Sequence, residues 1–116
     1  MFSFKFSAFA VSALMLSAAS ALHLGVPADT TIGATTTVSF TSDPLDPAQF
    51  TLYLSKSNQI WAYYGTLATP VDDTAGVVTV TIPAGVDPAP DYVLKAVHVD
   101  NFDWVIAQSP TFALTA

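Results

Sequence analysis

The sequence predicts an all-β domain, an immunoglobulin/fibronectin-III-like two-sheet sandwich of about seven strands, preceded by a signal peptide. Short runs rich in β-branched and aromatic residues recur along the chain, and several of them alternate apolar and polar residues. Clusters of Pro, Gly, Asp and Asn separate these runs. Because no stretch after residue 21 has sustained helical periodicity, frequent short strands favour a sandwich.

The first 21 residues are typical of a signal peptide. Lys5 supplies one positive charge, and the apolar run AFAVSALML follows at residues 8–16. Ala19 and Ala21 have the small side chains that signal peptidase requires. We therefore expect cleavage after Ala21, one secreted domain at residues 22–116, and no membrane anchor. An uncleaved anchor is the alternative, although the apolar run is shorter than the ~20 residues of a spanning helix.

The expected mature domain is acidic and lacks cysteine. Its charged residues are nine Asp, Lys56 and Lys95, which give a formal charge of −7. A negative surface repels phosphates, so we expect neither nucleic acid nor anionic lipid as a partner. Asp is common in turns because its short side chain can bond to the nearby backbone. Without disulfides, stability has to come from packing and strand pairing.

The first three expected strands cover residues 22–26, 34–41 and 50–55. The second (ATTTVSFT) and the third (FTLYLS) alternate apolar and polar side chains, so each has one face suited to a core. Residues 43–47 (DPLDP) separate these two strands, because a proline has no N–H to donate to a ladder.

Four further strands are expected at residues 60–67, 77–82, 92–99 and 104–114. The turn-forming segments DDTAG and PAGVDPAP flank the alternating run at 77–82. The last two strands form a late hairpin with residues 100–103 (DNFD) at its tip. We expect the final strand to break near Pro110.

Tyr92 is a candidate structural residue. It begins the penultimate strand, after a loop and two positions before the apolar Leu94. In immunoglobulin-like sandwiches, a tyrosine at this position sends its hydroxyl to the loop backbone and forms a tyrosine corner. An ordinary core tyrosine is the alternative.

Several segments together resemble a fungal family. They are IGATTTVSF at 32–40, FTLYL at 50–54, DTAGVVTVTIP at 73–83, DYVLKA at 91–96 and IAQSPTFAL at 106–114. They are similar to the N-terminal Ig-like domain of the yeast cell-wall β-1,6-glucan synthesis proteins, also called the Ser/Thr-rich GPI-anchored membrane family. Members often carry Trp in place of Phe40 and continue into a stalk and a GPI signal, which we do not carry over. The resemblance implies a wall protein linked to β-1,6-glucan, and the family supplies no catalytic residues.

Candidate catalytic and metal-binding residues are few. His23 and His98 are the histidines, and no nucleophile motif such as G-x-S-x-G occurs. His23 becomes a copper ligand only as the amino-terminal residue, which cleavage after Ala21 prevents. We therefore expect no enzyme activity and no cofactor.

The acidic residues form close pairs, as the two carboxylates of a glycosidase could. These pairs lie in predicted turns, and not in an apolar pocket that would raise the pKa of one carboxylate. The pairs are Asp43 with Asp46, Asp72 with Asp73, and Asp100 with Asp103. Asp100, Asn101 and Asp103 offer fewer oxygen ligands than the six to eight that Ca²⁺ takes. We therefore expect turn formation and no metal site.

The aromatic residues Trp61, Tyr63 and Trp104 are the predicted ligand-binding residues. Trp61 and Tyr63 share one face of the fourth expected strand, and Trp104 follows the hairpin tip. Aromatic rings can stack on the apolar face of a sugar, and an acidic domain suits a neutral polysaccharide. The sequence therefore predicts a cell-wall polysaccharide partner, with ordinary core packing of these rings as the alternative. A small secreted interaction protein that binds a host or partner protein is the second functional hypothesis.

Overall fold

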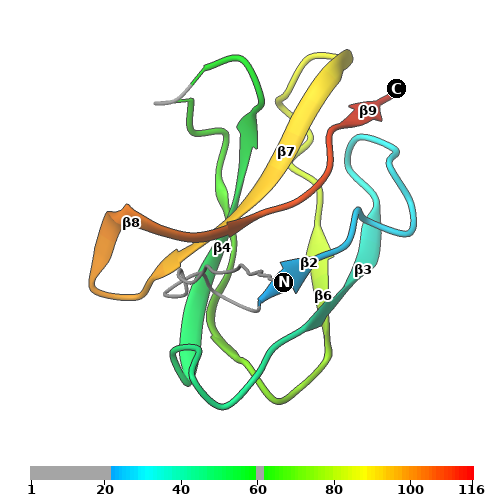
Figure 1. The fold of residues 1–116 in the computed structure, drawn as a ribbon. Coiled ribbons are helices and arrows are strands. Elements are labelled where there is room, and N and C mark those ends of the chain that lie inside the picture. The colour runs from blue at the N-terminus through cyan, green and yellow to red at the C-terminus, as the bar shows by residue number, and fades with distance from the viewer. Residues whose placement is uncertain (1–21, 60–61) are drawn as a thin grey trace, which may run out of the picture.

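The computed structural model describes residues 22–59 and 62–116, and strands are the only regular secondary structure within them (Figure 1). This confirms the all-β prediction. The strands are β2 (His23–Leu24), β3 (Thr35–Thr41), β4 (Gln49–Lys56), β5 (Thr66–Asp72), β6 (Val77–Thr81), β7 (Ala89–His98), β8 (Asn101–Gln108) and β9 (Phe112–Leu114). These described segments contain no helix long and apolar enough to cross a membrane.

The strands form two antiparallel sheets. The smaller sheet has the order β2–β3–β6, and the larger has the order β5–β4–β7–β8. Strand β9 pairs with the first half of β7, whereas β8 pairs with its second half. Strands β8 and β9 are therefore successive pieces of one sheet edge. The two sheets form the immunoglobulin-like sandwich that the sequence predicts.

The core lies between the sheets and consists of the inward residues of the alternating strands. Phe40 of β3 and Phe50 of β4 meet edge to face, with ring centroids 5.3 Å apart, and so join the two sheets. Burial of each large side chain contributes roughly 1.5–3 kcal/mol. The buried cluster includes Leu22, Leu24, Val38, Phe40, Phe50, Leu52, Leu54, Val71, Val80, Ile82, Tyr92, Leu94, Ala96, Phe112 and Leu114.

The prediction of a strand at residues 60–67 is wrong at residues 62–65 and correct at 66–67, while residues 60–61 lie outside the described residues. Residues 62–65 form a loop, and β5 begins at Thr66. Gly65 has a φ of 132°, which residues with a side chain rarely adopt, so the chain can turn sharply there. Pro70 is tolerated within β5 because this strand lies at the sheet edge and its pairing with β4 bulges at this point.

Other boundaries differ by a few residues. The late hairpin turns at residues 99–100, so most of the expected tip at 100–103 belongs to β8. The first expected strand shortens to β2. The expected break near Pro110 separates β8 from β9. The predicted signal peptide, at residues 1–21, lies outside the described residues.

Candidate functional site

The outer face of the larger sheet is covered, although it points away from the core. On β4, Tyr53 alternates with the core residues Leu52 and Leu54, yet it is only 7% exposed. On β7, Lys95 lies opposite Tyr53 in the register and is 6% exposed. Aromatic side chains from the β4–β5 loop and from β8 pack against Tyr53 and cover this face.

The loop between β4 and β5 holds Tyr63 over this face. The Ser55 hydroxyl donates to the carbonyl oxygen of Ala62 at 2.7 Å. The N–H of Tyr64 donates to the carbonyl oxygen of Leu54 at 2.9 Å. These bonds fix the backbone on both sides of Tyr63 to β4, so the strand sets the position of the ring.

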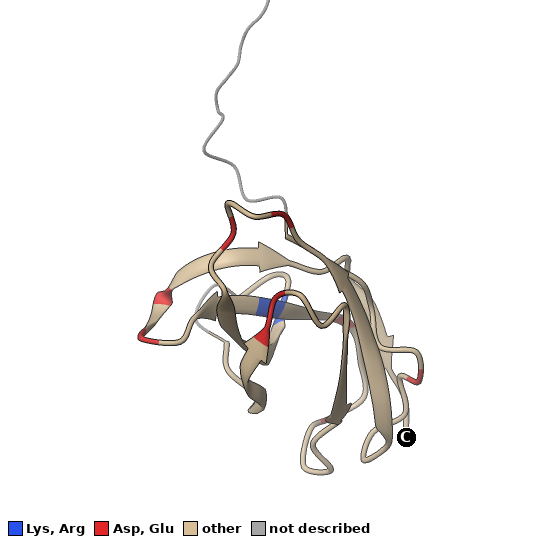
Figure 2. Cartoon of the chain, turned by 90° about the horizontal axis from the view of Figure 1, so that it is seen from below, with Lys and Arg blue, Asp and Glu red and all other residues tan. Residues whose placement is uncertain are grey.

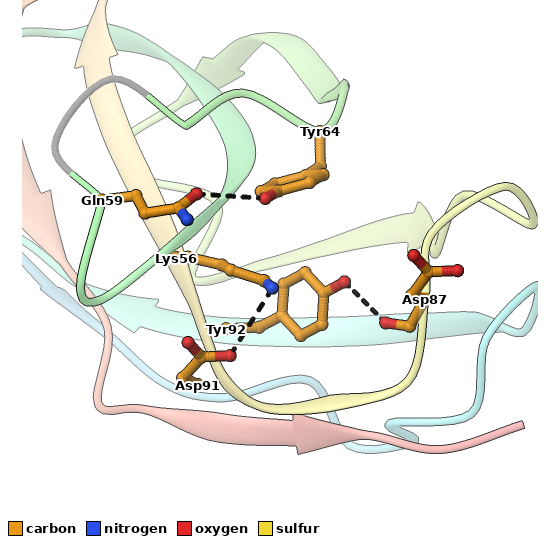
Figure 3. A network of polar contacts seen from close by, with 6 residues as sticks. All are labelled: Lys56, Gln59, Tyr64, Asp87, Asp91 and Tyr92. Carbon is orange, nitrogen blue, oxygen red and sulfur yellow. Dashed lines mark hydrogen bonds and ion pairs between the residues drawn. The ribbon is translucent and has the colours of Figure 1, made fainter.

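A second group of contacts attaches the same loop to the end of the sheet (Figure 3). The Tyr64 hydroxyl donates to Gln59 Oε1 at 3.3 Å, and the Tyr64 and Tyr92 rings meet edge-on at 5.6 Å. The Lys56 ammonium lies 5.7 Å from the Tyr64 ring and 5.3 Å from the Tyr92 ring. It is also 3.9 Å from the Asp91 carboxylate. Tyr64 thus anchors the loop, while the side chain of Tyr63 is 55% exposed and its hydroxyl bonds to Thr66.

Tyr92 is fixed by both its ring and its hydroxyl. It is 1% exposed, and its hydroxyl donates to the carbonyl oxygen of Asp87 at 2.6 Å (Figure 3). This bond from the strand back to the preceding loop has the geometry of a tyrosine corner. Burial raises the pKa of Tyr92 above its ordinary value, because a phenolate loses hydration inside a protein.

Strand β8 bulges beside the covered face. Its register on β7 jumps between Val97 and His98, so residues 102–104 have no partner positions on β7. Bulges re-aim side chains and are frequent beside functional sites. In this bulge Phe102 and Trp104 are 49% and 60% exposed. The β7–β8 hairpin thus presents large apolar rings to solvent.

Three rings from three elements meet beside the bulge. Tyr53, Tyr63 and Phe102 have ring centroids 5.2–5.6 Å apart, in tilted or edge-on arrangements. They border a hollow of about 360 Å³, which we call the aromatic cleft. Its lining residues are Tyr53, Ala62, Tyr63, Lys95, Phe102, Asp103 and Val105. The aromatic cleft therefore combines apolar ring surface with one basic and one acidic residue.

The Tyr53 hydroxyl has a shifted acidity in this environment. Burial is the main cause that raises its pKa, and the negative charge of Asp103 raises it further. The phenol therefore remains protonated at neutral pH. In this form it can both donate and accept a hydrogen bond.

The structure separates the three residues predicted to bind a ligand. Tyr63 lines the aromatic cleft. Trp104 does not line it, because its ring stacks on the His98 ring at 4.0 Å and a tilt of 34°. Trp61 lies outside the described residues, so the prediction that it shares one face with Tyr63 stays a prediction.

Tyr53, Lys95 and Asp103 line the aromatic cleft, although sequence reasoning missed them. Tyr53 and Lys95 alternate with core residues, which indicates only that they point away from the core. Asp103 belongs to a segment typical of a turn. The pairing of β4 with β7 and of β7 with β8 brings them together. The clustering of aromatics at 61–64 and 102–104 is the sequence feature that points to this region.

The acidic residues lie mainly on loops and strand ends, whereas Lys56 and Lys95 lie in strands β4 and β7 (Figure 2). Asp29, Asp43 and Asp72 each accept a hydrogen bond from the N–H two residues ahead. Hydrogen bonds from Thr31 lower the pKa of Asp29, and those from Thr74 lower the pKa of Asp72. Within residues 22–59 and 62–116, no three His, Cys, Asp or Glu side chains gather as metal ligands.

A second hollow, of about 510 Å³, lies where the β3–β4 loop meets the β5–β6 turn. Its polar groups already take part in turns. The Ser42 hydroxyl donates to the carbonyl oxygen of Asp73 at 2.7 Å, and the Asp43 carboxylate accepts from the N–H of Leu45. This hollow is a weaker candidate than the aromatic cleft, where three rings converge.

Comparison with known proteins identifies a family. A family model described as the Kre9/KNH-like N-terminal Ig-like domain matches residues 26–114. The match covers β3 to β9 and thus both sheets of the sandwich. No curated protein matches the sequence significantly.

Proposed function

We propose that this protein, which belongs to the Kre9/KNH family, is a secreted, non-enzymatic protein of the fungal cell wall that binds a neutral glucan. The family is linked to the synthesis of cell-wall glucan and is associated with the wall. The aromatic cleft is the observation that carries the proposal. The signal-peptide pattern of residues 1–21 supports secretion.

The aromatic cleft suits a sugar for physical reasons. Its ring faces can cover the C–H surface of a pyranose and remove apolar area from water. Tyr63 and Phe102 each have two side-chain torsions, so ordering them costs little conformational entropy. Bonds from β4 already hold the Tyr63 backbone in place. Part of the ordering cost is therefore met before a ligand arrives.

The arrangement of the acids supports a non-enzymatic role. A glycosidase needs two carboxylates flanking a bond, one with a raised pKa. Asp43 and Asp46 are instead engaged with each other's turn, since the N–H of Asp43 donates to the Asp46 carboxylate at 2.9 Å. The carboxylates of Asp29 and Asp72 have lowered pKa values and remain ionised at neutral pH.

A pull-down on insoluble neutral β-glucan tests the proposal. The secreted protein should be retained without release of soluble sugar. Phe102→Ala should reduce the affinity by about tenfold, which corresponds to ~1.4 kcal/mol and is typical of an aromatic residue central to an interface. Leu45→Ala is the matched control, because Leu45 is 94% exposed and lies outside the aromatic cleft.

Circular dichroism of each variant shows whether the β fold is intact. No retention of the wild-type protein, or release of sugar from the glucan, would contradict the proposal. Equal retention of the folded Phe102→Ala variant would show that the ligand binds elsewhere.

A second candidate function is docking of a partner protein on the β7–β8 hairpin. Val99, Phe102, Trp104 and Val105 are each 44–60% exposed. Gathered apolar residues of this kind mark interaction surfaces on small proteins. A parallel pull-down from host extract, with the same two variants, distinguishes this function from glucan binding.

A further inference from the structure

We propose that Lys95 and Asp103 make the aromatic cleft selective for uncharged, hydroxyl-rich sugar units over charged ones. This inference rests on the proposed function, because it concerns the ligand of the same cleft. It adds the chemical class that the cleft accepts and names two residues that determine this specificity.

Lys95 is placed by its strand. It lies on β7 opposite Tyr53, lines the aromatic cleft and is 6% exposed. A charged side chain at this depth is costly in a small domain unless polar groups compensate it. Lys95 therefore brings a positive charge to the lining of the cleft, next to its aromatic rings.

Asp103 is placed by the β8 bulge. It lines the same cleft as Lys95 and is exposed. The bulge at residues 102–104 puts it next to the ring of Phe102 instead of opposite a residue of β7. Its negative charge also acts on Tyr53, whose pKa it helps to raise. An acidic residue therefore lines the aromatic cleft together with its rings.

The two side chains have complementary hydrogen-bonding roles. An ammonium only donates and an ionised carboxylate only accepts, whereas a sugar hydroxyl does both. Neighbouring hydroxyls of one uncharged sugar unit can thus bond to both Lys95 and Asp103. A uronate or a phosphate is attracted by Lys95 but repelled by Asp103 and by the domain charge of −7. A cationic sugar is instead repelled by Lys95 and attracted by Asp103.

The size of the hollow limits the ligand further. A volume of about 360 Å³ lies near the lower end of small-molecule sites, which span roughly 300–1,000 Å³. The aromatic cleft therefore holds only a short segment of a sugar chain at a time. A neutral hexose segment could come from glucan or from mannan, and the experiment separates these two sources.

Titration calorimetry of the secreted protein with short oligosaccharides tests the inference. The probes are a gluco-oligosaccharide, a manno-oligosaccharide and an oligoglucuronate of equal length. The wild-type protein should bind a neutral probe at least about tenfold more tightly than the oligoglucuronate. Asp103→Asn keeps the size of the side chain and removes its charge, so this preference should fall by about tenfold, the effect of one charge-assisted hydrogen bond. The preferred neutral probe identifies the source.

Asp100→Asn is the matched control, because Asp100 is exposed in the β7–β8 turn and does not line the cleft. It should leave the preference within about twofold of wild type, since an exposed charge outside the site is screened. Lys95→Met, a second variant with an apolar side chain of similar length, should lose affinity for the neutral probe. Its melting temperature shows whether it folds.

The outcomes separate the two proposals. A wild-type protein that binds none of the oligosaccharides overturns the proposed function and this inference together. A wild-type protein that binds them, with an Asp103→Asn variant that keeps the full preference, overturns only the selectivity. An equal loss of preference in Asp100→Asn also overturns it, because the effect would then come from net charge.

Discussion

Tyr92 and Tyr53 illustrate how single residues stabilise the domain without a disulfide. The hydroxyl of Tyr92 bonds to the β6–β7 loop, and its ring packs against Tyr64. One side chain of β7 therefore contacts both the β6–β7 loop and the β4–β5 loop that carries Tyr63. Tyr53 is buried on the opposite face of the same sheet by neighbouring rings. Both phenols have raised pKa values because they are removed from water. The Tyr92 hydroxyl therefore holds a loop in place, and the Tyr53 ring forms part of the aromatic cleft.

The corner bond of Tyr92 predicts a measurable stability cost. Tyr92→Phe keeps the ring and leaves the Asp87 carbonyl oxygen without its donor. The free energy of unfolding should fall by about 1–3 kcal/mol, measured by urea denaturation. Tyr63→Phe is the control, because its hydroxyl bonds to Thr66 at an exposed position. A corner variant as stable as wild type would show that the bond contributes nothing.

The tyrosines also predict a loss of stability at alkaline pH. Their folded-state pKa lies above the unfolded value of 10.0, so folding favours the protonated phenol. This contribution is fully present below pH 10 and is lost as the pH rises through the folded-state pKa. Unfolding free energies measured from about pH 8 to about pH 11 should decline, and less steeply in Tyr53→Phe and Tyr92→Phe. An identical slope in all three proteins would contradict the assignment.

The elements of the sandwich differ in how well the sequence predicts them. Strand β3 alternates in burial along its whole length, so its apolar face is evident from the order of its residues. The core residues of β4 and β6 also recur at every second position, although β4 is buried on its outer face as well. Strand β5 is not evident, because its partner β4 and its edge position compensate for Pro70. The preceding aromatic segment resembles a strand but forms the loop that positions Tyr63. Local propensity is overridden there by hydrogen bonds to β4.

The site is harder to predict than the fold because it depends on pairing between distant strands. The aromatic clusters in the sequence predict both Tyr63 and Trp104 as ligand-binding residues, whereas of these two only Tyr63 lines the aromatic cleft. The bulge that brings Phe102 to Tyr53 depends on register, which no local pattern specifies. Register is specified by the whole buried face of β7. The lining of the aromatic cleft thus follows from the sheet and not from any single segment.

The loop that carries Tyr63 gives a prediction for the element scale. Ser55→Ala removes the donor to Ala62, and Ser55 is fully buried. The free energy of unfolding should fall by about 1–3 kcal/mol, and glucan retention should fall as well because Tyr63 loses its support. Ser57→Ala, at an exposed position of the same loop, should stay within about 0.5 kcal/mol of wild type. If stability falls and glucan retention is unchanged, Tyr63 does not contribute to glucan binding.

At the scale of the whole molecule, charge and apolar surface are separated. The nine aspartates lie mainly on loops and strand ends, and Lys56 and Lys95 lie in the larger sheet (Figure 2). The exposed rings gather on the β7–β8 hairpin of that same sheet. A net charge of −6 opposes association of the protein with further copies and with anionic polymers, because like charges repel. The aromatic cleft therefore combines apolar ring surface with the positive charge of Lys95.

This separation of charge predicts how binding responds to salt. A neutral glucan contributes no ions, so its retention should change less than about twofold between roughly 0.05 and 0.5 M NaCl. A basic partner protein would instead be attracted by the negative net charge of the protein, and its capture should weaken steeply as salt screens that attraction. The two measurements can be made on one sample, with glucan beads and host extract in parallel. Salt-sensitive glucan retention would indicate a charged contaminant or partner on the beads. Salt-resistant capture of a protein by the β7–β8 hairpin would favour apolar docking over sugar binding as the role of the exposed rings.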